Sequence, residues 1–125
     1  MRVYRSDRGG IGIWKLAGVV DRDDALVLLR ALEESGERCR GCFILDFENV
    51  KHVDYRAFGM LEDGCPDGAH VLLCGLSDYI LDIFAFVSRR NIFDVFPDWK
   101  RALRYVAVER GKLGPSLAAI SAGGK

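Results

Sequence analysis

The sequence predicts a single α/β domain with a mixed sheet of four or five strands and four helices. A nearly continuous apolar run at residues 43–47 is typical of a strand buried on both faces, as in a parallel sheet. Apolar residues recur with helical spacing after Asp21 and after Ser77, and both residue types favour helix N-termini. A chain of 125 residues, half of them apolar, can build one core of ordinary size but not two.

The first half of the chain predicts two strands, a helix and a third strand. Residues 2–6 can form a hairpin with residues 11–16 across a Gly-Gly turn. Asp21 is a suitable N-cap for the first helix, and Gly36 can end that helix. The predicted buried stripe of this helix consists of Ala25, Leu28, Leu29 and Leu32.

The central segment predicts the third strand at residues 43–47, a polar turn and a second helix over residues 55–62. Val53 returns to the core, and Asp54 is a candidate N-cap whose carboxylate accepts from the first free amides of the helix. A helix that starts directly after a buried strand lies at the carboxyl edge of the sheet. Because α/β domains tend to carry their sites at this edge, we expect the functional site here.

The second half predicts a strand at residues 70–74, a helix capped by Ser77, a short edge strand at residues 92–96 and a last helix from Asp98. The helix after Ser77 has the predicted stripe Ile80, Ile83, Phe84 and Val87. The last helix has the predicted stripe Trp99, Ala102, Leu103 and Val106.

The ends of these two helices also carry signals. Arg89 and Arg90 are expected in the last turn of the helix after Ser77, where cations suit the negative end of the dipole, and Asn91 is expected as a left-handed cap. We expect the folded domain to span residues 1–110. Residues 111–125, rich in Gly, Ala and Ser, are predicted to be a flexible tail.

The central segment LDFENVKHVDYRAFGML resembles the signature of STAS domains, the fold of anti-sigma factor antagonists and of the cytosolic ends of sulfate transporters. The resemblance rests on Leu45-Asp46, Val53, Asp54 and residues 58–61, and the order of elements resembles this fold from residue 3 to residue 106. It implies a STAS-like domain whose helices pack mainly on one face of the sheet. The segment departs from the family pattern where Tyr55 and Arg56 occupy the phospho-acceptor Ser/Thr positions.

The resemblance implies a non-catalytic, cytoplasmic regulatory module of bacterial signal transduction and transcription that works by protein–protein interaction. The implied partner is an anti-sigma factor or a related kinase-like regulator. The only hydroxyl at residues 55 and 56 is that of Tyr55, and neither residue is a serine or threonine. No phosphorylation is therefore expected at the family's site. The expected partner-binding residues are Asp54, Tyr55, Arg56, Gly59, Ser77 and Asp78.

An alternative function remains open, because STAS domains also occur in transporters and in phospholipid-transport complexes. The chain is then a small-ligand or lipid-handling module of a transport complex. A hydrophobic ligand requires a cavity, whereas a protein-binding module shows a filled core and an exposed apolar or aromatic patch.

The charge balance bears on partners. Lys plus Arg and Asp plus Glu number 18 each, so no overall field favours nucleic acid or an anionic membrane, and binding to either requires a local patch. The longest apolar runs are much shorter than a bilayer span, and the start of the chain lacks the apolar core of a signal peptide. We therefore expect a cytosolic protein that does not insert into membranes.

Four cysteines without a secretion signal do not predict a disulfide framework. Cys74 lies in an apolar run and is expected to be a small core residue. No metal or other cofactor is expected. One zinc site is conceivable at the starts of two neighbouring strands, with the ligands Cys39, Cys42, Cys65 and His70.

The sequence contains no phosphate-binding glycine loop, GxSxG or HExxH motif. Asp46, His52 and Asp54 are close in sequence and have the chemistry for acid–base catalysis. Each also has a structural explanation, because Asp46 ends a strand, Asp54 caps a helix and His52 lies in a polar turn. We therefore predict no catalytic residues and no enzyme activity.

Overall fold

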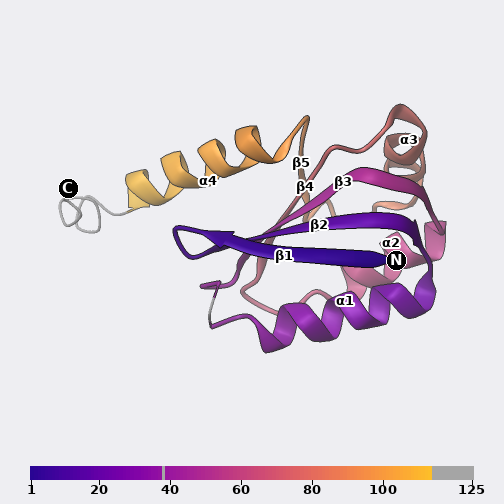
Figure 1. The fold of residues 1–125 in the computed structure, drawn as a ribbon, viewed down its shortest axis with the longest axis horizontal. Coiled ribbons are helices and arrows are strands. Elements are labelled where there is room, and N and C mark those ends of the chain that lie inside the picture. The colour runs from indigo at the N-terminus through magenta and orange to yellow at the C-terminus, as the bar shows by residue number, and fades with distance from the viewer. Residues whose placement is uncertain (38, 114–125) are drawn as a thin grey trace.

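The computed structural model describes residues 1–37 and 39–113, which form a five-stranded sheet with helices on both faces (Figure 1). The strands are β1 (Arg2–Arg8), β2 (Ile11–Val20), β3 (Cys42–Val53), β4 (His70–Cys74) and β5 (Asp94–Phe96). The helices are α1 (Arg22–Glu34), α2 (Tyr55–Gly64), α3 (Asp78–Val87) and α4 (Trp99–Leu113). The strands lie side by side in chain order; β1 and β2 are antiparallel and the other neighbours are parallel. The predicted mixed sheet and four helices are therefore confirmed.

β3 lies in the middle of the sheet, so its prediction as a buried strand is confirmed. The polar turn predicted after Phe47 is wrong, because β3 continues as a strand to Val53. The polar residues of this extension are exposed, and the extension is held by pairing with β2, in which Val20 lies opposite Val53. A strand can carry polar side chains where one of its faces is exposed to solvent. The polar residues after Phe47 therefore predicted the wrong end for β3.

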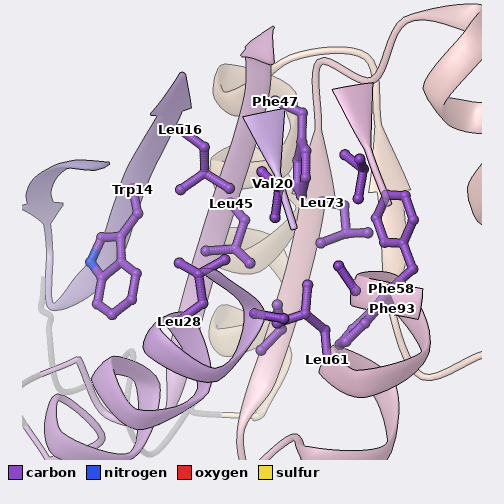
Figure 2. Close-up of a cluster of buried hydrophobic side chains, with 14 of the residues drawn as sticks. Trp14, Leu16, Val20, Leu28, Leu45, Phe47, Phe58, Leu61, Leu73 and Phe93 are labelled. Atoms are coloured by element: carbon purple, nitrogen blue, oxygen red, sulfur yellow. The ribbon is translucent and has the colours of Figure 1, made fainter. Parts of the chain in front are cut away.

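The larger core lies between the sheet and α1, α2 and α3 (Figure 2). Trp14, Leu45 and Leu73 from three neighbouring strands point to the same side, where Leu28 of α1 and Leu61 of α2 also lie. α4 covers the other face, where its Ala102 and Val106 join a smaller core that includes Ile13, Ile44 and Leu72. The helices are thus packed mainly on one face, as expected.

The four predicted N-caps are confirmed. The Asp21 carboxylate accepts from the amide of Asp24, and the Asp24 carboxylate accepts from the amide of Asp21, so the pair forms a capping box. The side chains of Asp54 and Ser77 accept from the first turns of α2 and α3. Asp98 accepts from the amide of Arg101 at the start of α4 at 2.8 Å. Each cap satisfies an amide that otherwise has no partner within the helix.

The end of α3 differs from the prediction because of a buried carboxylate on α2. Glu62, 3% exposed, accepts from the Ser88 hydroxyl at 2.7 Å and from the amides of Arg89 and Arg90 at 3.0 and 3.1 Å. These bonds end the helix at Val87, so Arg89 and Arg90 follow α3 and are not in its last turn. Asn91 is left-handed, with φ 54°, but lies beyond the helix end.

α4 extends past the predicted domain boundary at residue 110, so residues 111–113 are helical. The rest of the predicted tail, residues 114–125, lies outside the described residues. Among the helices of residues 1–37 and 39–113, none has the length and apolar character needed to cross a membrane.

The Glu62 hydrogen bonds predict a strong effect of substitution on stability. Glu62→Ala should lower the free energy of unfolding at neutral pH by about 2–3 kcal/mol, because three partly buried donors lose a charged acceptor. Urea denaturation measures this change. Asp63→Ala, at an exposed neighbour, is the matched control and should change stability by less than about 0.5 kcal/mol. Equal losses of stability in Glu62→Ala and Asp63→Ala would contradict a stabilising role for the Glu62 hydrogen bonds.

The same carboxylate predicts a pH dependence. Burial opposes its ionisation, but the bonds from the Arg89 amide, the Ser88 hydroxyl and the Arg90 amide outweigh burial and hold the pKa of Glu62 below its ordinary value. A depressed pKa stabilises the fold above the pKa of the unfolded chain, and this stabilisation is lost as pH falls through the folded value. The difference in free energy of unfolding between the parent and Glu62→Gln should therefore become smaller as the pH is lowered, as measured by urea denaturation at a series of acidic pH values.

Candidate functional site

The predicted site begins at Asp54, the residue between β3 and α2. Its carboxylate accepts from the Arg56 amide at 2.9 Å, which caps the helix. The same carboxylate accepts from Nε and Nη2 of Arg56 at 3.1 and 2.9 Å. One carboxylate therefore caps α2 and also holds the guanidinium in a forked ion pair.

This pair neutralises both charges. The side-chain hydrogen bond from Arg56 is the largest cause that lowers the pKa of Asp54 to about 2, followed by the bond from the Arg56 amide. The same side-chain bond raises the pKa of Arg56. Arg56 is therefore not an isolated surface cation, and its guanidinium lies 5.6 Å from the centre of the Tyr55 ring. The corner presents an aromatic ring beside an internally compensated ion pair.

Exposed aromatic residues of α3 lie next to Tyr55. A surface hollow of about 340 Å³ is lined by Tyr55 and, from α3, by Tyr79, Asp82, Ile83 and Phe86. Phe86 is 87% exposed, and Tyr55 and Tyr79 are 58% and 55% exposed. We call Tyr55, Tyr79 and Phe86 the aromatic surface. It joins the start of α2 to the outer side of α3.

Sequence reasoning missed Tyr79 and Phe86 because it considered only the buried stripe of α3. A signal was present. α3 reads DYILDIFAFV, with apolar residues on all sides and only two charged residues, Asp78 and Asp82. A surface helix normally has a polar outer face, so an apolar outer face indicates a contact surface.

A second hollow of about 470 Å³ adjoins the first and shares Tyr55 and Phe86 with it. Its lining includes Arg56 and Gly59 from α2, so the structure brings together three of the predicted site residues. A Cβ atom on Gly59 would meet no atom within 4 Å outside its own helix neighbourhood. Packing therefore does not require glycine here, and its small size keeps this side of α2 open.

Ser77 and Asp78 lie at the start of α3 and line neither hollow. The Ser77 hydroxyl accepts from the Ile80 amide at 3.2 Å, so its role in the structure is that of a cap. Tyr79, which follows Asp78, has its hydroxyl 2.8 Å from Nδ1 of His52 on β3, and the two rings stack with centres 5.7 Å apart. His52 therefore positions Tyr79 and does not lie in a polar turn, because it belongs to β3.

The three residues with acid–base chemistry have separate partners. Asp46 is 3% exposed and accepts from the Glu48 amide at 3.0 Å, whereas His52 contacts Tyr79 and Asp54 binds Arg56. A Cβ atom at Gly75 would lie 2.7 Å from the Asp46 carboxylate, and the φ of Gly75 is +70°. Glycine is required there to bring the chain close to Asp46.

The conceivable zinc site does not form. Cys42 and His70 are opposite each other across β3 and β4, and Nε2 of His70 lies 3.3 Å from the Asp94 carboxylate. Within the described residues, no three His, Cys, Asp or Glu side chains form a group that could hold a metal ion. Burial also raises the pKa of the Cys42 and Cys65 thiols, which disfavours the thiolates that zinc prefers.

Comparisons with known proteins identify the fold. No family model matches the chain, and no curated protein matches it. The solved structure of the anti-sigma factor antagonist SpoIIAA in its unphosphorylated form matches 85% of this chain and 98% of its own length, with 14% identity and a TM-score of 0.60. The chain has the anti-sigma factor antagonist fold. A putative anti-sigma factor antagonist from Thermotoga maritima matches 84% of this chain and 94% of its own, with 10% identity and a TM-score of 0.65.

The phosphorylated form of Bacillus SpoIIAA also matches, with a TM-score of 0.52 and 12% identity over 83% of this chain and 99% of its own. The resemblance drawn from the sequence is therefore confirmed for the fold. In this anti-sigma factor antagonist fold, the chain carries an Asp54–Arg56 ion pair and three exposed aromatic residues around the start of α2.

The ion pair predicts the titration of Asp54. Arg56→Ala should raise the pKa of the Asp54 carboxyl from about 2 towards its ordinary value of 3.8, because the largest stabilising bond is removed. Carboxyl ¹³C NMR over an acid titration measures this shift. Arg22→Ala is the control, since Arg22 contributes the smallest of the named effects, and should leave the Asp54 pKa nearly unchanged. An unchanged Asp54 pKa in Arg56→Ala would rule out the forked pair.

Proposed function

We propose that this chain is a non-catalytic regulatory module that binds another protein through the aromatic surface and the neighbouring start of α2. The observation that supports this most directly is Phe86, which is 87% exposed on a helix that also packs against the core. Apolar aromatic side chains gathered on a surface are typical of protein contacts. The similarity in fold to anti-sigma factor antagonists makes an anti-sigma factor or a related kinase-like regulator the proposed partner class.

The aromatic surface has the composition of a binding centre. Tyrosine rings provide large contact areas with few rotatable bonds, and a hollow between such rings can receive an apolar side chain of the partner. Tyr79 is already held by His52, so less conformational freedom is lost when a partner binds it. Tyr55 and Phe86 border both hollows and are therefore the central residues of the proposed contact.

The Asp54–Arg56 pair defines the charge that a partner meets. An unpaired arginine at this position would favour an acidic or neutral partner segment. Because Asp54 already neutralises Arg56 and Asp82 borders the hollow between Tyr55 and Tyr79, an apolar, neutral partner segment fits better than an acidic one. Asp54 and Gly59 support this contact by placing Arg56 and by leaving space beside it, whereas Ser77 and Asp78 contribute through the start of α3, which carries Tyr79.

The proposed contact predicts which substitutions weaken binding. Tyr55→Ala and Phe86→Ala should each weaken the affinity for a purified partner by about 2 kcal/mol or more, because each removes a central aromatic contact. The partner is first isolated from native cytosol by retention on the parent protein. Affinities are then measured by titration calorimetry, after circular dichroism has confirmed each fold.

Leu26→Ala and Val27→Ala are matched controls, since these apolar residues of α1 are 50% and 53% exposed and lie outside the aromatic surface. They should bind like the parent. Arg56→Glu should also weaken binding, since it places a second carboxylate beside Asp54. If Tyr55→Ala, Phe86→Ala and Arg56→Glu all bind within about 0.5 kcal/mol of the parent, the interface lies elsewhere.

The proposed binding is not switched by serine phosphorylation. The chain has no threonine and no serine between Ser35 and Ser77, so the start of α2 offers no acceptor of the usual kind. Incubation with a serine kinase of the anti-sigma type should leave residues 54–62 unmodified in peptide mass spectrometry. Phosphate found on Ser77 would contradict binding that is independent of phosphorylation, because the phosphate would add negative charge two residues before Tyr79.

A further inference from the structure

The balanced total charge of the chain conceals a separation of charge between the two faces of the sheet. α1, α2 and α3 together carry eight acidic and three basic residues, whereas residues 99–110 of α4 carry four basic residues and one acidic residue. α1 and α4 lie on opposite sides of the sheet (Figure 1). The molecule therefore presents a positive side that the net charge does not reveal.

Two strand residues extend this positive side. The guanidinium of Arg8 and the ammonium of Lys15 lie 5.0 and 5.6 Å from the centre of the Trp99 ring, and the Lys100 ammonium lies 5.8 Å from it. Three cations from β1, β2 and α4 thus gather around one ring. We call the exposed residues Arg8, Lys15, Lys100, Arg101 and Arg104 the basic face.

Internal acidic groups compensate the basic face only in part. Asp98 lies 3.6 Å from Arg101, with both side chains largely exposed, and Glu109 borders the hollow beside Arg104. An exposed pair at this distance is weak and is screened by salt. Within the described residues, no ion pair joins Arg8, Lys15, Lys100 or Arg104 to a carboxylate, so these four cations remain available to an anionic partner.

The basic face also contains exposed apolar side chains. Tyr105 and Val108 are 38% and 52% exposed and border a hollow of about 400 Å³ together with Arg101 and Arg104. These four residues are spaced at i, i+3, i+4 and i+7, so they form one outward stripe on α4. A nucleic-acid backbone is recognised mainly by cations and hydrogen-bond donors, which leaves Val108 without a role. A lipid surface uses both the cations and the apolar side chains.

We propose that the basic face docks the folded protein onto a membrane surface rich in anionic phospholipid. The cations contact headgroup phosphates, while Tyr105 and Val108 lie at the headgroup level. α4 keeps its packing on the sheet, so the protein adsorbs without inserting. The aromatic surface on α2 and α3 is built from different residues, so this docking is separate from the proposed protein contact.

The test is sedimentation of the full chain with vesicles. Vesicles of phosphatidylglycerol and phosphatidylcholine should bind it at low salt, and vesicles of phosphatidylcholine alone should not. Salt at about 0.5 M should release it, because exposed charges are then screened beyond about 4 Å. Arg101→Glu with Arg104→Glu should lower the partition coefficient at least about tenfold, since each charge near an anionic surface contributes about as much as a severalfold change in affinity.

Arg22→Glu with Arg30→Glu is the matched control, because it changes the total charge equally on α1, and it should bind like the parent. Should the double glutamate variant of α4 fail to fold, Lys100→Gln with Arg104→Gln tests two exposed cations of the same basic face. Equal loss in the α1 control, equal binding to both kinds of vesicle, or no vesicle binding would overturn the proposal.

A second measurement distinguishes lipid from nucleic acid. Trp99 fluorescence, followed in the Trp14→Phe variant, should shift to shorter wavelength on addition of phosphatidylglycerol vesicles, because the ring at the basic face becomes less hydrated. Val108→Ser should weaken vesicle binding severalfold and leave binding to a short DNA duplex unchanged. Tighter binding to the duplex than to the vesicles, or no effect of Val108→Ser on vesicle binding, would overturn the choice of lipid.

Discussion

The arrangement of this domain depends on the burial and pairing of β3. This strand runs from Cys42 to Val53, pairs with β2 along most of its length and separates the two cores. β4 pairs with it only as far as Asp46, so the second half of β3 extends beyond β4. α3 approaches that extension, and Tyr79 meets His52 there. The stagger between two parallel strands thus places α2 and α3 around one exposed corner, where each helix begins with a satisfied cap.

A buried carboxylate then determines how these two helices lie against each other. Glu62 binds the segment that follows α3, and Phe58 of α2 packs edge-on against Phe84 of α3 with ring centres 5.3 Å apart. Leaving a buried, charged acceptor without its hydrogen bonds costs more free energy than an intact bond contributes. The bonds to Glu62 therefore keep the two helices in one register. The distance between Tyr55 and Phe86 is consequently a property of the fold, which favours a preformed contact surface over one that must assemble.

The elements that sequence predicted correctly are those encoded locally. Asp21, Asp54, Ser77 and Asp98 cap helices because a short polar side chain reaches amides two or three residues away. Features that depend on distant partners were missed: the extension of β3 depends on β2, and the end of α3 depends on Glu62. The candidate site was only half predicted for the same reason. Tyr55 was found from its neighbours in sequence, whereas Tyr79 and Phe86 join it only through the packing of α3 on α2.

Charge shows the same limit of local reasoning in both directions. Arg56 reads in the sequence as a free cation, yet its partner two residues earlier neutralises it and leaves an aromatic ring as the main feature of that corner. Equal numbers of positive and negative residues suggest that the protein has no electrostatic field. In the fold, however, the acidic helices pack on one face of the sheet and the basic helix packs on the other. A count along the chain averages over faces that the sheet keeps apart. In this domain exposed aromatic side chains therefore lie where the sequence indicates charge, and a positive surface lies where the composition indicates none.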